Sequence, residues 1–353
     1  MRMTRQRGFT IVELMVAATL GLLILAGAIS MFISNKRIYT EQDEMGRLQE
    51  NARFAMNMLI KDIRMAGHTG CNDDAATVTN HITGAGTATN IHSFIPVEGS
   101  ENGGNWQPSG ASTDVGSSDG ISLRYLAHTD NYAMDPAMST GDEEIYSSSG
   151  SSLDLGDRVA IADCNSADIV VVTAVTLTGT AGCVSSGPTN VACQDELAHI
   201  STSTPSGAEP GNATSALSKT YDEQASVLEY ITARYFIVND ADGNPVLNRR
   251  SGEAAAEPVI EGVESMQFLY GEDTTGNDRV ADTYVNAGAV TDWEDVVSVK
   301  IALLVRSINE YGADKDTQSY DLLGTSFNPT DDRRRRRVFT TTVQIRNRIS
   351  SDS

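Results

Sequence analysis

The stretch from Leu14 to Ile33, LMVAATLGLLILAGAISMFI, decides the fold of this 353-residue chain. Its twenty residues carry no charge, and a helix that spans a bilayer needs about 20 apolar residues. Arg2, Arg5 and Arg7 precede it and predict a cytoplasmic N-terminus, because basic flanks stay on the cytoplasmic side of a membrane. No small-x-small cleavage site ends the apolar run, so an ordinary secretory signal peptide is disfavoured. We therefore expect a membrane anchor.

The helical period continues beyond this stretch. Apolar residues recur in steps of three or four, at Met45, Leu48, Ala52, Ala55, Leu59 and Ile63. Charged residues fill the other positions, among them Lys61 and Asp62. No proline interrupts residues 9–66, and Gly67 is suited to end a helix. The pattern predicts one helix over residues 9–66, about 87 Å long at 1.5 Å per residue, with 9–33 apolar on all sides and a single apolar stripe thereafter.

The remainder divides by composition. Residues 67–226 are rich in Ser, Thr, Gly and Asn and predict a loop-rich region, with most of 72–120 as loop. Short strands are expected at Ile121–Leu126, Arg158–Ala162 and Ile169–Leu177. Residues 227–353 predict an antiparallel sheet region, with strands at Leu228–Val238, Met266–Tyr270, Val296–Arg306 and Phe339–Ile345. In the third of these, alternation places on one face Val297, Val299, Ile301, Leu303 and Val305.

The charge is strongly uneven along the chain. It carries 26 Lys+Arg against 47 Asp+Glu, for a net charge of -21, which argues against direct nucleic-acid binding because a phosphate backbone requires a basic footprint. Residues 65–332 hold 10 bases and 40 acids, whereas residues 333–353 hold 7 bases and 1 acid. The acidity therefore belongs to a soluble, self-repelling head.

The start of the apolar run carries a specific motif. Gly8-Phe9-Thr10-Ile11-Val12-Glu13-Leu14 resembles the prepilin signature of type IV pilins and pseudopilins: a short basic leader, Gly, an aromatic residue, Glu five positions after Gly, and a long apolar helix. The segments 50–55 (ENARFA) and 62–71 (DIRMAGHTGC) narrow the resemblance to minor pilins of the PilW type, which are related to pseudopilin J of type II secretion. Islands at 260–273 and 338–347 resemble the same proteins.

This resemblance implies that a prepilin peptidase removes residues 1–8 after Gly8 and methylates Phe9. It implies that Glu13 pairs with the N-terminal amine of a neighbouring subunit. The implied fold is α+β and pilin-like, with a long N-terminal transmembrane and amphipathic helix packed on a head rich in antiparallel sheet.

The implied function is assembly and priming of a type IV pilus near the filament tip. The chain would lie in the inner membrane as a single-pass protein with a periplasmic C-terminal domain, and later in the pilus at the cell surface. Its partners would be other minor and major pilins, the assembly platform and a tip adhesin. Twitching motility and adhesion would depend on it through the pilus. Two alternatives stay open: a type II secretion pseudopilin, and a tip adhesive module whose 72–120 loops contact glycans.

The four cysteines, Cys71, Cys164, Cys183 and Cys193, contain no C-x-x-C spacing, which argues against zinc or redox chemistry. An even count in an exported chain indicates disulfides. Sequence alone allows three pairings, and we favour Cys71–Cys164 as a tie between helix and sheet and Cys183–Cys193 as a loop staple.

Two charged clusters are also notable. An acidic group in residues 272–282 lacks the EF-hand spacing and is better explained as a solvated loop than as a calcium site; it comprises Glu272, Asp273, Asn277, Asp278 and Asp282. A basic run is expected to be a solvated edge that meets an acidic surface, on this subunit or on a partner pilin that it docks; it comprises Arg333, Arg334, Arg335, Arg336 and Arg337.

No catalytic motif is found, and neither an enzyme activity nor a cofactor is expected. The five histidines lie in polar sequence and are predicted to be surface residues: His68, His81, His92, His128 and His199.

Overall fold

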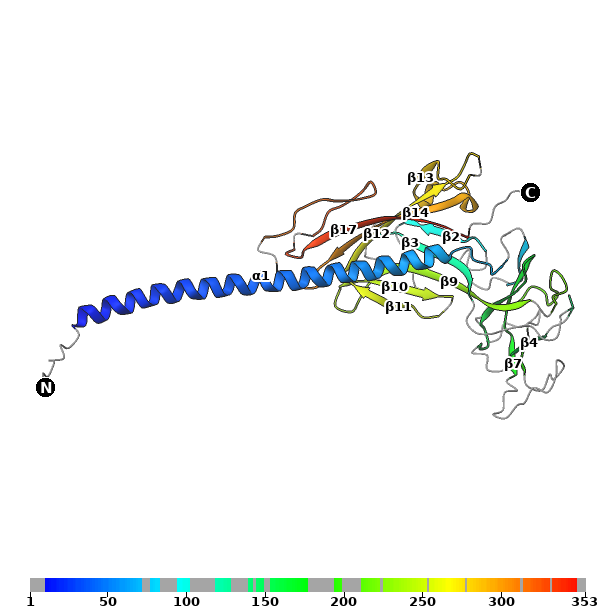
Figure 1. The fold of residues 1–353 in the computed structure, drawn as a ribbon, viewed down its shortest axis with the longest axis horizontal. Helices are drawn as coiled ribbons and strands as arrows, with labels where there is room; N and C mark the ends of the chain where they lie inside the picture. Colours follow the sequence, from blue (N-terminus) through cyan, green and yellow to red (C-terminus); the bar gives the residue numbers. More distant parts are fainter. Residues whose placement is uncertain are drawn as a thin grey trace, which may run out of the picture.

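The computed structural model describes residues 10–71, 77–82, 94–101, 118–127, 139–141, 144–148, 153–176, 194–198, 211–222, 225–252, 254–276, 278–311, 314–330 and 332–347. Figure 1 shows one long helix whose N-terminal half projects away from a sheet-rich head, with the chain's N-terminus at its far end.

The helix α1 extends over Ile11–Met65. Thr10 caps its start, and Gly67 follows its end with a φ of 78°, a conformation that favours glycine. A Cβ on Gly67 would also lie 2.4 Å from the carbonyl oxygen of Asn347, so the helix ends where the C-terminal segment passes. The predicted long helix is confirmed within the described residues.

The helix α1 packs against two large sheets. Among the described residues, eight strands form one sheet in the order β1-β6-β5-β9-β10-β11, with β3 pairing with β9 and β2 with β3. Their bounds are β1 Val78–Asn80, β2 Val97–Ser100, β3 Gly120–Ala127, β5 Arg158–Ala162, β6 Ala167–Val171, β9 Ser226–Asn239, β10 Pro245–Ser251 and β11 Glu257–Glu261. The pairings are antiparallel except for β1 with β6.

The second sheet is antiparallel and four-stranded in the part of the chain described, in the order β13-β12-β14-β17. Its strands are β12 Val263–Glu272, β13 Thr283–Val285, β14 Val296–Arg306 and β17 Arg336–Gln344, and short 3-10 turns lie at Ala287–Ala289 and Trp293–Asp295. Two smaller groups complete the described strands: β15 Tyr320–Leu322 with β16 Thr325–Phe327, and β4 Glu144–Ser148 with β8 Gln194–Ala198 and β7 Ala174–Thr176. The α+β, pilin-like fold class is confirmed.

The main core lies where the C-terminal half of α1 packs on both large sheets. Leu48, Leu59 and Ile63 of the helix are buried together with Tyr235 of β9 and Leu303 of β14. Burial of one such large side chain stabilises the fold by about 1.5–3 kcal/mol. The head therefore packs against the apolar stripe of α1 that the helical period predicted.

The strand predictions need several corrections. Ile169–Leu177 is not one strand, because β6 ends at Val171 and β7, in another sheet, begins at Ala174. Residues 72–120 contain the short strands β1 and β2, and the prediction of mostly loop there stays a prediction because most of this segment lies outside the described residues. In β14, a register shift opposite Gly271 and Glu272 places Val296, and not Val297, in the helix-facing core.

The other face of β14 is also covered. Ala302 and Leu304 pack against Leu322 of the β15–β16 hairpin. A strand buried on both sides loses the polar face that alternation leads one to expect.

Candidate functional site

The N-terminal segment is the first candidate site. Gly8 and Phe9 lie outside the described residues. Glu13 is exposed in the first turn of α1. Its Oε2 accepts hydrogen bonds from the backbone N and the Oγ1 of Thr10, both at 3.1 Å, and its backbone N donates to Thr10 Oγ1 at 3.2 Å. This reciprocal capping box satisfies amides that the helix start leaves unpaired.

The segment of α1 from Ile11 to Ile33 is exposed along its whole length. Its large apolar side chains expose between 50% and 78% of their surface, at Phe32 70% and at Ile24 74%. At 1.5 Å per residue the segment is about 34 Å long, enough to cross a hydrocarbon core of about 30 Å. In the described part of the chain, α1 is the one helix with the length and composition to cross a membrane. So much exposed apolar surface requires a lipid or protein environment.

A buried carboxylate joins this helix to the head. Asp62 of α1 is only 5% exposed, although the helical period placed it off the apolar stripe. Its Oδ2 accepts a hydrogen bond from Tyr235 Oη at 2.7 Å and lies 3.3 Å from Arg249 Nε. Tyr125 Oη lies 3.4 Å from its Oδ1. Asp62 is thus buried although it lies off the apolar stripe, because partners from β3, β9 and β10 compensate its burial.

The two tyrosines respond to this environment. Burial, together with the negative charge of Asp62, raises the pKa of Tyr125 to about 12 and raises the pKa of Tyr235 further. Both hydroxyls therefore stay protonated at physiological pH and act as hydrogen-bond donors to the helix.

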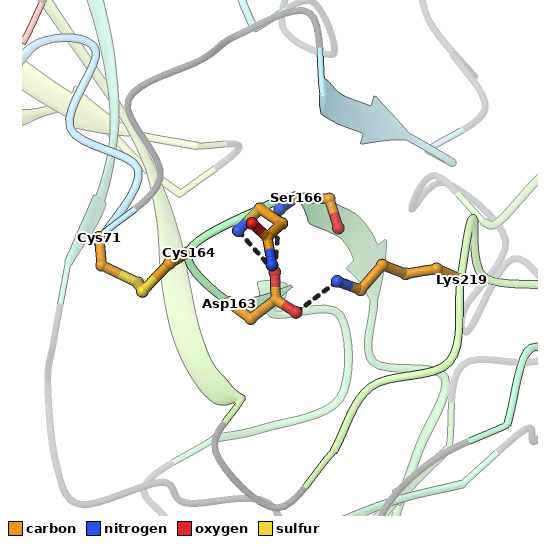
Figure 2. Close-up of a disulfide and its surroundings, with 6 residues drawn as sticks. Cys71, Asp163, Cys164, Ser166 and Lys219 are labelled. Atoms are coloured by element: carbon orange, nitrogen blue, oxygen red, sulfur yellow. Dashed lines mark hydrogen bonds and ion pairs between the residues drawn. A yellow bond between two sulfur atoms is a disulfide. The ribbon is translucent and has the colours of Figure 1, made fainter.

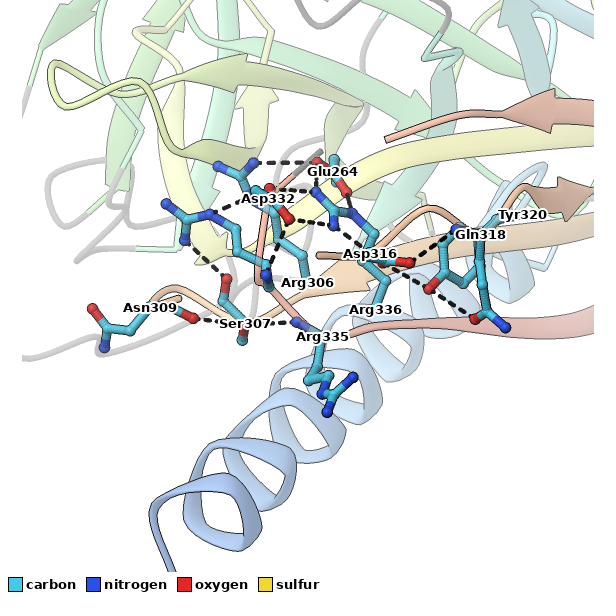
Figure 3. Close-up of polar contacts among 11 residues, drawn as sticks. Glu264, Arg306, Ser307, Asn309, Asp316, Gln318, Tyr320, Asp332, Arg335 and Arg336 are labelled. Carbon is cyan, nitrogen blue, oxygen red and sulfur yellow. Dashed lines mark hydrogen bonds and ion pairs between the residues drawn. The ribbon is translucent and has the colours of Figure 1, made fainter. Parts of the chain in front are cut away.

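The arginines of this run differ in burial, and Figure 3 shows Arg335 and Arg336 beside α1. Arg336 is buried: its Nε lies 2.6 Å from Glu264 Oε2, and its Nη1 lies 2.7 Å from Asp332 Oδ1 and 3.2 Å from Asp316 Oδ2. Although burial alone lowers its pKa, hydrogen bonds to Asp332 and Glu264 raise the pKa of Arg336 above its ordinary value.

Its neighbours are less buried. Arg335 reaches α1, with Nη2 2.8 Å from Glu41 Oε1, and Arg334 Nε lies 3.7 Å from Asp332 Oδ2. Arg333 and Arg337 are exposed. The expectation of a solvated edge is wrong for Arg336, because strand alternation and nearby acids draw it inward. Arg335 meets an acidic residue of this same subunit, which was one of the two alternatives.

The disulfide Cys71–Cys164 is present and joins the segment after α1 to the end of β5 (Figure 2), with Cα atoms 4.7 Å apart. The turn beside it is held by Asp163, whose Oδ1 accepts the backbone N–H groups of Asn165 at 2.8 Å and Ser166 at 2.9 Å. Lys219 pairs with the same carboxylate. Cys183 and Cys193 lie outside the described residues, so their pairing stays a prediction.

The acidic group is not a solvated loop throughout. Glu272 and Asp273 are each 2% exposed. Glu272 Oε1 accepts hydrogen bonds from Thr291 N at 2.8 Å and from Thr291 Oγ1 at 2.6 Å. The Glu272 carboxylate therefore holds the loop at Thr291 in place. Asn277 lies outside the described residues, and within those described no group of three or more His, Cys, Asp or Glu side chains could hold a metal ion.

The histidine prediction is also wrong at one position. His81 is 7% exposed, and its Nε2 lies 2.6 Å from Asp168 Oδ1. Asp168 also accepts from Tyr221 Oη at 2.6 Å and Ser218 Oγ at 2.7 Å. No local pattern marks these residues, because their contacts span at least 50 positions. His92, His128 and His199 lie outside the described residues.

The predicted sites thus remain apart along the molecule. Glu13 lies in the first turn of α1, Arg335 of the arginine run pairs with Glu41 near the middle of the helix, and the disulfide joins Cys71, beyond the last helical residue Met65, to Cys164. An arrangement of this kind suits assembly through an exposed helix, with the head held at one fixed place on that helix.

Comparison with known proteins points the same way. A family model described as type IV pilus-assembly protein W matches residues 234–347, which include β12, β14 and β17. A second, described as the prokaryotic N-terminal methylation motif, matches residues 3–29. No curated protein and no solved structure gives a significant match. Together the two family matches support a type IV minor pilin of the PilW type and indicate a part in pilus assembly.

Proposed function

We propose that this minor pilin enters the inner membrane as a prepilin with its head in the periplasm. A prepilin peptidase then cleaves it after Gly8 and methylates Phe9. The assembly platform moves it into the filament, where it helps to prime the pilus near the tip and reaches the cell surface. The observation that carries this proposal is the exposed apolar segment from Ile11 to Ile33, which serves in lipid first and in the filament core later.

Glu13 is proposed to align the subunit in the filament. Among the described residues its carboxylate contacts only Thr10, so no cation of the described chain neutralises it. A carboxylate within an apolar environment requires a nearby cation. The N-terminal amine of the preceding subunit, left free after cleavage, would supply that cation.

The head is proposed to select neighbouring pilins rather than to catalyse a reaction. A hollow of about 420 Å³ lies between α1 and the edge strand β17, lined among others by Met56, Phe339 and Arg337. Arg337 is exposed there and is the member of the arginine run best placed to dock an acidic partner pilin on this side. Other minor pilins, the major pilin and a tip adhesin are the partners that this surface would face.

The capping geometry allows a sharp test of Glu13. Glu13→Gln keeps the capping box, because Gln serves at this position as Glu does, but it removes the charge. Thr10→Val removes the cap and keeps the charge. We expect Glu13→Gln to be processed normally yet depleted from sheared pili, and Thr10→Val to be retained, with both measured by immunoblot. The reverse pattern would assign Glu13 to local helix capping alone.

A further inference from the structure

A hollow of about 340 Å³ lies where α1 leaves its exposed apolar segment and meets the base of the head. Its lining combines one apolar wall, one acid and several cationic or hydroxyl groups. They include Ile33, Lys36 and Arg37 from the helix and Glu310, Tyr311 and Arg333 from the head.

Three cations in this hollow are not neutralised. Lys36, Arg37 and Arg333 are all exposed, and none of them forms an ion pair with any residue that the structure describes. By contrast, Arg335 and Arg336, which follow closely in the same run, are paired with Glu41 and Glu264. The hollow thus gathers three unpaired basic side chains against the single acid Glu310.

The position of the hollow along the helix is informative. Ile33 is the last apolar residue before the first charges, and Lys36 and Arg37 follow it by about 4.5–6 Å along the axis at 1.5 Å per residue. A bilayer has a hydrocarbon core of about 30 Å and a total thickness of about 40–45 Å, so each headgroup layer is roughly 5–8 Å deep. With Ile11–Ile33 in the hydrocarbon, the three cations lie at the depth of the lipid phosphates.

We propose that this hollow binds the phosphate of an anionic glycerophospholipid headgroup while the subunit waits in the membrane. This inference rests on the membrane-anchored state proposed above. Charge complementarity selects the occupant: residues 65–332 hold 10 bases and 40 acids, so an anionic membrane surface repels most of the head. The hollow gives its base one contact of the opposite sign, which also orients the head on the bilayer.

The test uses the full chain in lipid nanodiscs made from an equal mixture of phosphatidylglycerol and phosphatidylcholine. Native mass spectrometry counts the lipids of each class that stay bound after release. The test variant combines Lys36→Gln, Arg37→Gln and Arg333→Gln. The matched control combines Arg53→Gln, Lys61→Gln and Arg64→Gln, which removes the same charge from exposed positions at least about 30 Å beyond Ile33 on the same helix, several Debye lengths away.

The wild-type chain and the control are expected to retain phosphatidylglycerol in preference to phosphatidylcholine. Because each basic residue strengthens binding to an anionic lipid surface roughly five-fold, the test variant should lower this preference by up to about 100-fold. Equal retention of both lipids by the wild type would overturn the inference. So would a preference that survives in the test variant, or one that the control loses equally.

Two further outcomes separate this inference from its alternatives. If the test variant keeps its lipid preference but no longer cross-links to another pilin in membranes, an acidic partner pilin occupies the hollow and the lipid assignment is wrong. If the wild-type chain fails to insert into nanodiscs of either lipid alone, the membrane-anchored state itself is contradicted, independently of the hollow.

Discussion

The junction between α1 and the head offers the most informative perturbation, Asp62→Ala. The substitution removes the acceptor of the 2.7 Å hydrogen bond from Tyr235 Oη and the partner of Arg249 Nε at 3.3 Å. A hydrogen bond to a charged group contributes about 1.5–3 kcal/mol, and loss of one member of a buried ion pair costs about 3–5 kcal/mol. Because the Arg249 side chain is 24% exposed, water compensates part of its loss, and we expect a decrease of about 3 kcal/mol in the free energy of unfolding.

Two milder variants separate the contributions of the charge and of the hydrogen bond to this decrease in the free energy of unfolding. Asp62→Asn keeps an oxygen for Tyr235 but loses the charge opposite Arg249, and is expected to cost about 1 kcal/mol. Tyr235→Phe removes the donor of the hydrogen bond to the carboxylate and is expected to cost about 1.5 kcal/mol. Urea unfolding of the full chain in detergent, followed by near-ultraviolet circular dichroism, measures all three. A double-mutant cycle between Asp62→Asn and Tyr235→Phe should reveal a coupling above about 0.5 kcal/mol.

The result that refutes this reasoning is simple to state. If Asp62→Ala changes the free energy of unfolding by less than about 0.5 kcal/mol, as surface substitutions do, the carboxylate does not hold the helix to the head. Additive effects of Asp62→Asn and Tyr235→Phe would likewise show that these two groups do not interact.

Three further predictions concern the head. Replacing both Cys71 and Cys164 by Ser should lower the free energy of unfolding by about 4 kcal/mol, because the bond closes a long loop; reduction of the wild type by dithiothreitol should cause at least this loss in a urea titration. Arg336→Leu removes the buried cation shared by Glu264, Asp316 and Asp332 and should cost about 3 kcal/mol, whereas Arg337→Leu, at an exposed position, should change thermal stability little; equal effects would contradict the assigned burial. Burial alone would raise the pKa of Asp168, but hydrogen bonds from His81, Tyr221 and Ser218 lower this pKa below its ordinary value. The Asp168 carboxylate therefore stabilises the fold above its ordinary pKa near 4. This stabilisation is lost as the pH falls through the lowered pKa. The midpoint of thermal unfolding should therefore fall below about pH 4 less steeply in Asp168→Asn than in the wild type, and parallel curves would argue against this role.

The helix and several strands were predictable because their signals are local. The uncharged run at residues 14–33 and the apolar stripe through Leu59 and Ile63 follow from a 3.6-residue period. Alternation predicted β14 with its bounds, Val296–Arg306. The motif around Glu13 needs no tertiary context at all, since each of its elements lies within a few residues of the next.

The buried polar groups were not predictable, because their partners are distant in sequence. Asp62 is compensated by Tyr235, which lies 173 residues away, and His81 by Asp168, which lies 87 residues away. A single sequence shows such residues only as charges between apolar positions, which normally face solvent. The burial of Arg336 was not predictable for the same reason. Whether Arg336 or Arg337 faces inward depends on the register of β17 against β14 and on Glu264 of β12.

The most direct test of the central claim is to determine the N-terminal peptide of this protein in purified pili by mass spectrometry. A minor pilin that is processed and then assembled through its exposed helix predicts a peptide that begins at Phe9 and carries one N-methyl group. Absence of the protein from pili, or its presence there with residues 1–8 still attached, would contradict the account.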